Sequence, residues 1–379
     1  MGKIADIFRQ HTDGYLREMG QVPSAHRKVI DDICGCRTPR SGYALYECSS
    51  CAHVHMTYLG CGNRHCPNCQ HSKGQQWLER NLGKQLPGAY FMVTFTVPAE
   101  VRALFYREQA ATYNALFAAS ADTLRAVLAN EKYCGASLAG FVSVLHTWGR
   151  TLQYHPHIHV IIPGGGLNAQ RSEWKSSHAN YLAPVNVLTQ LFRAKIRDEL
   201  AACQLDRYVP PQLWTQGWQV NVQAVGSNAR GALTYLAPYV FRVAIGDSRI
   251  VSVSDQSVTF RYTPSGQTRS RTLTLSVYDF MQRFLQHVLP RGFMKVRYYG
   301  FMSGGCSTPI ESIRALAQAA NSGACPVPLA AKDENAGESS EPRCPHCDGE
   351  LVLFVLSKRG FTYFANNAIR GSPEAIGMR

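Results

Sequence analysis

Acidic side chains are scarce in this sequence of 379 residues, and no apolar run reaches the length that a membrane-spanning helix requires. Only 26 Asp and Glu residues stand against 39 Lys and Arg residues, which gives a formal net charge of +13. A secretory signal peptide is also absent from the sequence. These absences argue against a membrane protein and a secreted one, and we expect a reducing cytoplasm.

The excess of positive charge predicts a polyanionic partner, most plausibly nucleic acid. The alternative is a basic, solvated surface that has no such partner. The length allows a sizeable core and two or three domains.

The 13 cysteines have the spacing of metal ligands rather than that of a disulfide framework. Cys48 and Cys51 form one C-x-x-C knuckle, and Cys66 and Cys69 form another. Four thiolates at this spacing suit tetrahedral Zn²⁺, so we predict one ion held by both knuckles. The residues left for a second ion are Cys34, Cys36, Cys61 and His65.

One more knuckle, Cys344-Pro-His-Cys347, follows an Ala-, Glu- and Pro-rich stretch at 326–343 that resembles a linker. Half a zinc site needs partners, and Cys306 and Cys325 are candidates.

Three histidines alternate along a predicted strand that continues into a β-branched, apolar run ending at Pro163. His155, His157 and His159 share one face of that strand, whereas Ile158 and Val160 point into a core. Parallel imidazoles on one strand can bind a divalent metal ion. The alternative is a set of histidines that are exposed or satisfied by hydrogen bonds.

A second β-rich run, 140–148, precedes this strand and carries His146. Antiparallel pairing of the two runs would bring His146 beside His157 and His159. Three ligands leave open positions on the metal, which is typical of a catalytic site. His155 is the rival for the third ligand.

The expected elements alternate in the order β-α-β-β-α-β, followed by a helix. This order predicts an α+β fold with a central antiparallel sheet and flanking helices. Its expected strands are 90–97, 140–148, 155–163 and 218–225, and its expected helices lie within 99–130, 185–203 and 229–242. We expect a zinc-ribbon-like domain at 1–85, a catalytic domain at 86–302 and a C-terminal segment at 303–379.

Two tyrosines, Tyr235 and Tyr239, are four residues apart in the last of these helices and therefore share a face. Asn228 is a plausible N-cap, and Pro238 is expected to kink the helix. A tyrosine hydroxyl that attacks phosphorus forms a phosphotyrosine, and Arg242 one turn further on could hold the phosphate charge. The alternative is that both tyrosines only pack.

Arginines alternate with aromatic residues in two later segments, 260–271 and 295–300. Rings and cations together are typical of single-stranded DNA binding, although a basic hairpin is often only solvated. The arginines expected to contact DNA are Arg261, Arg269, Arg271 and Arg297, together with Arg64 among the cysteines.

The motif His157-Ile158-His159 with a downstream tyrosine pair resembles the HUH single-strand endonucleases, and the surrounding sequence resembles the IS91-type rolling-circle transposases. The resemblance covers roughly residues 20–302 in the family's order. The matching stretches are Cys61–Gln70, His146–Gly149, His155–His159 with Pro163–Gly166, Tyr235–Ile245, Leu285–Phe293 and Arg297–Phe301.

This resemblance implies an HUH nuclease domain with a ferredoxin- or RRM-like core, a structural zinc domain and catalytic Mg²⁺ or Mn²⁺. It implies Tyr235 and Tyr239 as nucleophiles that nick and rejoin single-stranded DNA at transposon ends. The host replication machinery is a further candidate partner, and the expected location is the bacterial cytoplasm, at the nucleoid when DNA is bound.

Two other functions fit the same residues. A plasmid rolling-circle replication initiator or relaxase would use the same site. A non-catalytic, zinc-dependent DNA-binding regulator would carry the histidines as structural residues.

Overall fold

The structure is a computed structural model that describes residues 2–69, 71–226, 229–241, 244–321, 342–358 and 361–364, with the backbone alone at 71–73, 238, 239 and 241. The chain divides into two compact units. The terminal unit consists of residues 1–70 and 330–379, and the central unit consists of residues 71–329. These units differ from the three consecutive domains expected from the sequence: their first boundary lies near 70, and the C-terminal strands pair with the N-terminal ones.

The terminal unit contains a helix pair and a four-stranded antiparallel sheet with the order β14-β13-β1-β2. Its elements are α1 (Lys3–Met19), α2 (Ser24–Gly35), β1 (Tyr43–Cys48), β2 (Val54–Tyr58), β13 (Leu351–Lys358) and β14 (Phe361–Phe364). The pairing of β13 with β1, in which Cys48 lies opposite Leu351, joins the two parts of the sequence. Apolar residues at helical spacing account for both helices, since Ile4, Ile7 and Phe8 of α1 and Val29, Ile30 and Ile33 of α2 are buried.

The central unit is built on a five-stranded antiparallel sheet with the order β12-β4-β5-β3-β8. This confirms the predicted fold class and the alternating order of elements. The strands are β3 (Tyr90–Thr96), β4 (Phe141–Trp148), β5 (Tyr154–Pro163), β8 (Gln219–Ala224) and β12 (Val296–Tyr299).

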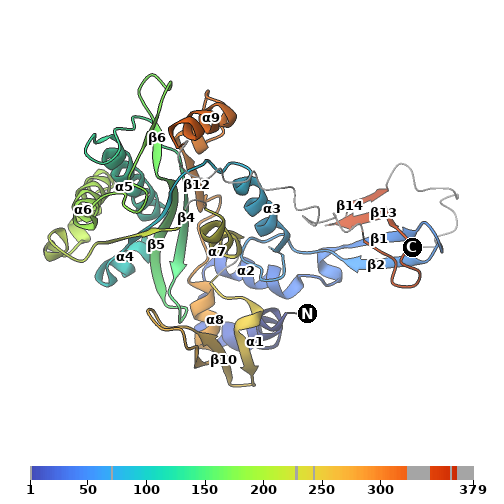
Figure 1. Cartoon of the computed structure of the whole chain (residues 1–379). Coiled ribbons are helices and arrows are strands. Elements are labelled where there is room, and N and C mark those ends of the chain that lie inside the picture. The colour runs from blue at the N-terminus through green and yellow to red at the C-terminus, as the bar shows by residue number, and fades with distance from the viewer. Residues whose placement is uncertain are drawn as a thin grey trace. The chain divides into compact units, whose positions relative to one another are not determined.

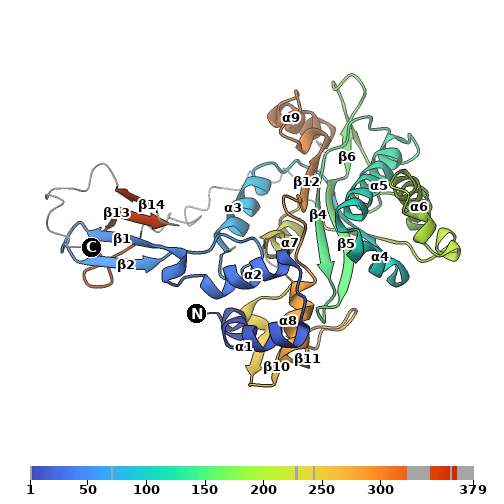
Figure 2. The same ribbon diagram turned by 180° about the vertical axis from the view of Figure 1, so that it is seen from behind.

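Helices cover both faces of this sheet (Figures 1 and 2). One face packs on α4 (Arg102–Arg107), α5 (Gln109–Ala129) and α6 (Val185–Ala202). The other packs on α3 (His71–Leu82), α7 (Arg230–Phe241) and α9 (Ile310–Ala320). Alternation along β5 separates the two faces: Ile158, Val160 and Ile162 enter the first core, and Ile161 enters the second.

Two smaller sheets complete the central unit. The first consists of β9 (Ile250–Val253), β10 (Ser257–Tyr262) and β11 (Arg271–Ser276), and it packs on α8 (Val277–Leu285). The second is the pair β6 (Gly165–Leu167) and β7 (Trp174–Ser176). Among the described helices, none is both long and apolar enough to cross a bilayer.

A buried histidine follows α8. His287 is 2% exposed, and its Nε2 donates to the carbonyl of Leu152 at 3.1 Å while its Nδ1 lies 3.2 Å from the hydroxyl of Thr147. One neutral tautomer satisfies both contacts. Burial lowers the pKa of His287 to about 3, so the ring is neutral near pH 7.

We predict that the central unit loses stability as the pH falls below 6.5. The pKa of His287 is lower in the folded chain than in the unfolded chain, so its contribution is complete above pH 6.5 and is lost progressively toward pH 3. At pH 5 the loss is on the order of 2 kcal/mol for this group. All 5 tryptophans lie in the central unit, so Trp fluorescence during urea unfolding in a chelator reports this unit alone.

The control is His287→Gln, which keeps a donor and an acceptor but removes the ionisable ring. It should weaken the dependence of the unfolding midpoint on pH between 7 and 5. An unchanged dependence in this variant would contradict the assignment.

Candidate active site

Three histidines meet at the centre of the sheet. His146 of β4 lies directly opposite His157 of β5, and His159 follows two residues later on the same face. One ring nitrogen from each lies within 4.8 Å of the others, and the ring centroids of His146 and His159 are 4.6 Å apart. The strand pairing expected from the sequence therefore brings these three together. The ring of His155 lies 5.2 Å from that of His157 and is not part of the group.

Neighbouring polar groups orient two of these rings. The Nδ1 of His157 donates to the carbonyl oxygen of His155 at 2.7 Å, which leaves the lone pair of the neutral ring on Nε2. The hydroxyl of Thr94 lies 3.0 Å from the Nδ1 of His159, because Thr94 is opposite His159 in the pairing of β3 with β5. In metal sites, hydrogen bonds to the second nitrogen of a ligating histidine fix the orientation of its ring, and these two contacts can do the same here.

All three imidazoles are neutral near pH 7. Burial lowers the pKa of His159 to about 4, and it holds the pKa values of His146 and His157 well below 6.5. Neutral imidazole is the form that ligates a metal, so protons do not compete until the pH is well below 6. The donor set therefore fits a divalent transition ion, with coordination positions left over.

The helix α7 presents Tyr235 to this group of histidines. The ring centroid of Tyr235 lies 6.4 Å from that of His159, and 53% of the side chain is exposed. The opposite side of the helix is buried in the core through Leu233, Leu236 and Val240. A tyrosine side chain thus stands at the solvent boundary beside three metal-ligand candidates.

The other parts of the predicted tyrosine motif are only partly described. The backbone of Tyr239 belongs to α7, which runs as one helix through position 238, but its side chain lies outside the described residues. Arg242 and the expected N-cap Asn228 also lie outside them.

A tryptophan and a lysine flank the histidines. Trp148 stacks on His146 with ring centroids 4.7 Å apart, and the Nζ of Lys295 lies 5.8 Å from the centre of the Trp148 ring. Lys295 also contributes to the lowered pKa of His146, after burial and the neighbouring histidines. A cation beside neutral imidazoles suits an anionic ligand.

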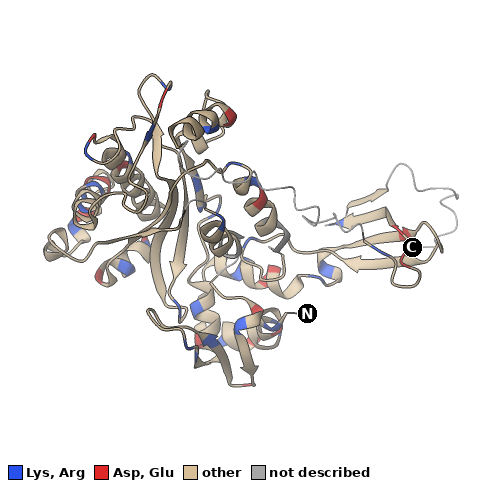
Figure 3. Cartoon of the chain, viewed as in Figure 1, with Lys and Arg blue, Asp and Glu red and all other residues tan. Residues whose placement is uncertain are grey.

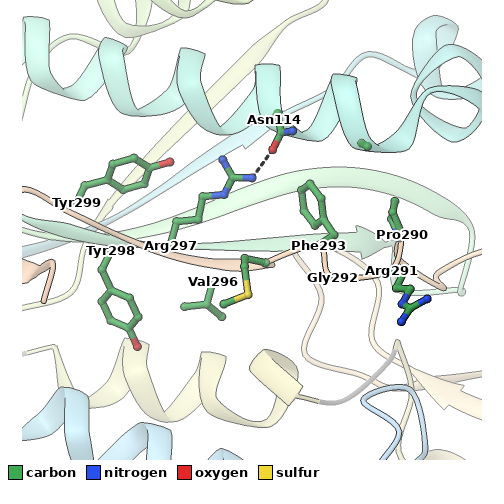
Figure 4. A pocket seen from close by; sticks show the side chains of 11 residues that line it. Asn114, Pro290, Arg291, Gly292, Phe293, Val296, Arg297, Tyr298 and Tyr299 are labelled. Carbon is green, nitrogen blue, oxygen red and sulfur yellow. Dashed lines mark hydrogen bonds between the residues drawn. The ribbon is translucent and has the colours of Figure 1, made fainter. Parts of the chain in front are cut away.

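An open groove of about 680 Å³ follows β12, the edge strand of the sheet (Figure 4). Arg297 and Tyr299 point toward α5, and Tyr298 points to the opposite side. The guanidinium carbon of Arg297 lies 4.1 Å from the centre of the Phe117 ring, and the group donates to Asn114. Arg297, which the sequence predicted to contact DNA, is therefore held in place among aromatic side chains.

In the part of the chain that Figure 3 colours, Lys and Arg residues are spread over many elements. In the hairpin of β10 and β11, Arg261, Arg269 and Arg271 are exposed, as expected, but Phe260 is buried in the core. That ring is therefore not available to stack on a base. Arg64 lies in the terminal unit and is half-buried.

Eight of the described cysteines form two groups of four, and neither group is the one predicted from spacing. Cys36, Cys61, Cys66 and Cys69 lie together, with the sulfurs of Cys36 and Cys69 3.3 Å apart. A hydrogen bond from Cys36, above all, holds the pKa of Cys69 below that of an ordinary thiol. Tetrahedral zinc would place its sulfurs about 3.8 Å apart, so this group fits the ion.

The predicted pairing of Cys48 and Cys51 with Cys66 and Cys69 is wrong because of the β1–β2 hairpin. The first knuckle lies at the tip of the hairpin, and the chain then returns along β2 until Leu59 donates to the carbonyl of Gly42 at 2.9 Å. The second knuckle thus meets Cys36 at the base. His65 is outside the group, as is Cys34, whose sulfur lies 3.5 Å from the hydroxyl of Thr12.

Sequence reasoning did not place Thr94 or Lys295 beside the histidines, although Lys295 begins the basic, aromatic segment 295–300. Both reach the site through the pairing or packing of segments that are distant in sequence. No local spacing marks such contacts, although a polar Thr94 within the apolar run of β3 was a weak signal.

Comparison with known proteins gives two family matches. A family described as "Putative transposase" matches residues 140–309, and one described as "Transposase zinc-binding domain" matches residues 7–97.

Two curated proteins are similar to the chain. "Putative transposase y4qJ" of Sinorhizobium fredii (strain NBRC 101917 / NGR234) is 35% identical over 320 residues, which cover 79% of this chain and 80% of that protein. "Transposase for insertion sequence element IS801" of Pseudomonas savastanoi pv. phaseolicola is 26% identical over 370 residues, which cover 92% and 88%. No solved structure matches the chain.

We predict that His157→Ala weakens binding of Mn²⁺ by more than about 100-fold, since it removes a ligand from a set of three. His155→Ala is the matched control, because it changes a histidine of the same strand that lies outside the group. The control should bind Mn²⁺ within about twofold of the unchanged protein, as measured by calorimetry on zinc-loaded chains.

Binding of DNA should persist in both variants, because we expect contacts of Lys and Arg with phosphates to supply most of the affinity. Equal loss of Mn²⁺ binding in the two variants would contradict the assignment. If His146→Ala retained Mn²⁺ binding and His155→Ala lost it, His155 would be the third ligand.

Proposed function

The chain belongs to the IS91 family of transposases, and from that premise we propose that it nicks and rejoins single-stranded DNA at transposon ends through a 5′-phosphotyrosine. As a transposase it binds DNA, and residues 7–97 carry its zinc-binding domain.

The observation that carries the proposal is the position of Tyr235 beside the three histidines. A nucleophile, a metal-ligand set and a cation are the groups that phosphoryl transfer needs, and they meet on one face of the sheet. We assign the three ligands to His146, His157 and His159. Imidazole is a softer ligand than Mg²⁺ prefers, so we expect Mn²⁺ to bind more tightly than Mg²⁺.

A divalent ion held by His146, His157 and His159 would supply a positive centre that withdraws charge from the scissile phosphate. The chain's own residues orient the reactants: Thr94 and the carbonyl of His155 hold the histidine rings, and α7 holds the tyrosine. Lys295 supplies further positive charge near His146, where negative charge develops on the phosphoryl oxygens.

We propose the following bond changes. The phenol oxygen of Tyr235 forms a bond to phosphorus, the bond from phosphorus to the 3′ oxygen breaks, and the phenol proton passes through solvent to the leaving 3′ hydroxyl. The 5′ end remains on the protein as a phosphotyrosine. A later attack by a 3′ hydroxyl on that phosphotyrosine reverses these changes and rejoins the strand.

A second tyrosine, Tyr239, extends the scheme. One phosphotyrosine occupies one nucleophile, whereas moving a strand from donor to target requires a second cut while the first end is held. Tyr239 lies four residues after Tyr235 in α7, a spacing that places both on one face of the helix. We propose that the two tyrosines share the metal and act in turn, with Arg242 holding the phosphate charge.

We further propose that the single strand runs along the groove of β12. The groove includes Met294, which is 67% exposed, and it runs along β12, which pairs with β4, the strand that carries His146. Arg297 points toward α5, which covers the face of the sheet opposite to the histidines, so the DNA strand would pass around the edge at β12 to reach Tyr235. Arg297 offers a cation, and the partly exposed rings of Tyr298 and Tyr299 line the same groove as candidate surfaces for stacking on bases.

We predict that Tyr235→Phe and Tyr239→Phe each retain some cleavage of an oligonucleotide but block complete transposition. The double substitution should cleave nothing, because no hydroxyl remains. Cleavage is measured on labelled single strands, and transposition by mobilisation of a flanked marker in cells. Normal mobilisation by Tyr239→Phe would show that one tyrosine does all the chemistry.

We predict that Arg297→Gln weakens binding of single-stranded DNA and reduces the slope of log K against log salt by about 0.7, the value for one lost phosphate contact. The matched control is Arg197→Gln on α6, where Arg197 also lies over an aromatic ring, that of Trp214, at 5.5 Å. Fluorescence anisotropy over a series of salt concentrations measures the affinity and the slope for each variant. Equal slopes for Arg297→Gln and the unchanged protein would remove the groove from the DNA path.

A further inference from the structure

We propose that Cys48, Cys51, Cys344 and Cys347 hold a second zinc ion, at a site assembled from opposite ends of the sequence. Cys48 and Cys347 are 299 residues apart, yet their sulfurs lie 3.4 Å from each other. The match to the zinc-binding family ends at residue 97 and does not reach the second pair. The site is separate from the group formed by Cys36, Cys61, Cys66 and Cys69.

The two knuckles have the same backbone conformation. In the first, the amide of Ala52 donates to the carbonyl of Cys48 at 2.9 Å, and Ala52 has a φ of 58°. In the second, the amide of Asp348 donates to the carbonyl of Cys344 at 2.8 Å, and Asp348 also has a φ of 58°. A left-handed backbone conformation is unfavourable for Ala and Asp. Because it recurs at the same position in both knuckles, the two loops have a common shape that presents two thiols.

A second pair of hydrogen bonds repeats the correspondence. The amide of Cys48 donates to the carbonyl of His53 at 3.0 Å, and the amide of Cys344 donates to that of Gly349 at 2.8 Å. Each bond spans five residues from the first cysteine of its knuckle. Two matched loops that face each other with four thiols form the donor arrangement of a zinc ribbon.

The sheet explains why the knuckles meet. Cys48 ends β1 and lies opposite Leu351, the first residue of β13, so both knuckles are at the same end of the paired strands. Gly349 fits closely here, since a Cβ at that position would lie 2.9 Å from the sulfur of Cys48. The metal would therefore fasten the C-terminal strands to the N-terminal hairpin.

The donor chemistry favours zinc over a disulfide. All four sulfurs lie within 4.8 Å of one another, and those of Cys51 and Cys344 are 3.7 Å apart, close to the separation of about 3.8 Å in tetrahedral zinc sites. The Nε2 of His55 lies 3.3 Å from the sulfur of Cys344, and an imidazole N–H there can donate to a thiolate. Four thiols at these separations suit the coordination of one zinc ion better than the formation of two disulfide bonds.

The experiment measures zinc per chain by mass spectrometry of the metal in the full-length protein, together with reactive thiols. The unchanged chain should hold two ions, one for each group of cysteines. The double variant Cys344→Ser/Cys347→Ser should hold one zinc ion per chain, and so should the double variant Cys48→Ser/Cys51→Ser. The variant with all four of these substitutions should also hold one ion, because the other group of cysteines is unchanged. Cys203→Ser, an exposed cysteine outside both groups, is the control and should hold two.

Limited proteolysis tests the structural consequence. Loss of the second ion should expose 342–364 to cleavage while the first group keeps its ion. Cys66→Ser alters the group of Cys36, Cys61, Cys66 and Cys69, so this variant should lose the ion of that group and keep the ion of the second site.

Three results would overturn the proposal. These are a single ion in the unchanged chain, two ions in Cys344→Ser/Cys347→Ser, and disulfides at these four cysteines in protein prepared under reducing conditions.

Discussion

The antiparallel pairing of β4 with β5 is the contact on which the candidate active site depends. In this register His146 lies opposite His157, so two histidines on different strands reach the same face as His159. Alternation along β5 sends Ile158 and Val160 to the other face, where they anchor the strand in an apolar core. A shift by one residue would turn the imidazoles toward that apolar core and turn Ile158 and Val160 toward the helix that carries Tyr235. The packing of the core therefore fixes the position of the histidines.

Local patterns predicted a large part of this arrangement. The β-branched run after His159 indicated a buried strand, and the period of two placed the histidines together on one side. A short connection between the runs indicated antiparallel pairing, and the order of strands and helices gave the fold class. These predictions succeeded because they depend on neighbours in sequence or on adjacent strands.

Predictions that required distant partners were wrong or absent. Spacing alone joined Cys48 and Cys51 to Cys66 and Cys69, because it did not take into account that a hairpin carries the first knuckle away from the second. The partners of Cys48 and Cys51 lie near the other end of the chain, and a C-x-x-C pair contains no information about which pair it meets. Thr94 was missed for the same reason, since its contact with His159 arises from the pairing of β3 with β5.

The central claim is that α7 carries the nucleophile, and capture of the covalent product tests it most directly. The protein is mixed with Mn²⁺ and a single strand from the transposon end that carries one dye at its 5′ end and another at its 3′ end. After denaturing electrophoresis, the account predicts that the 3′ dye migrates with the protein and that the 5′ dye is released. Peptide mass spectrometry should then find the phosphodeoxynucleotide on Tyr235 or Tyr239. Retention of the 5′ dye, an adduct on a residue outside α7, or cleavage with no adduct would contradict the account.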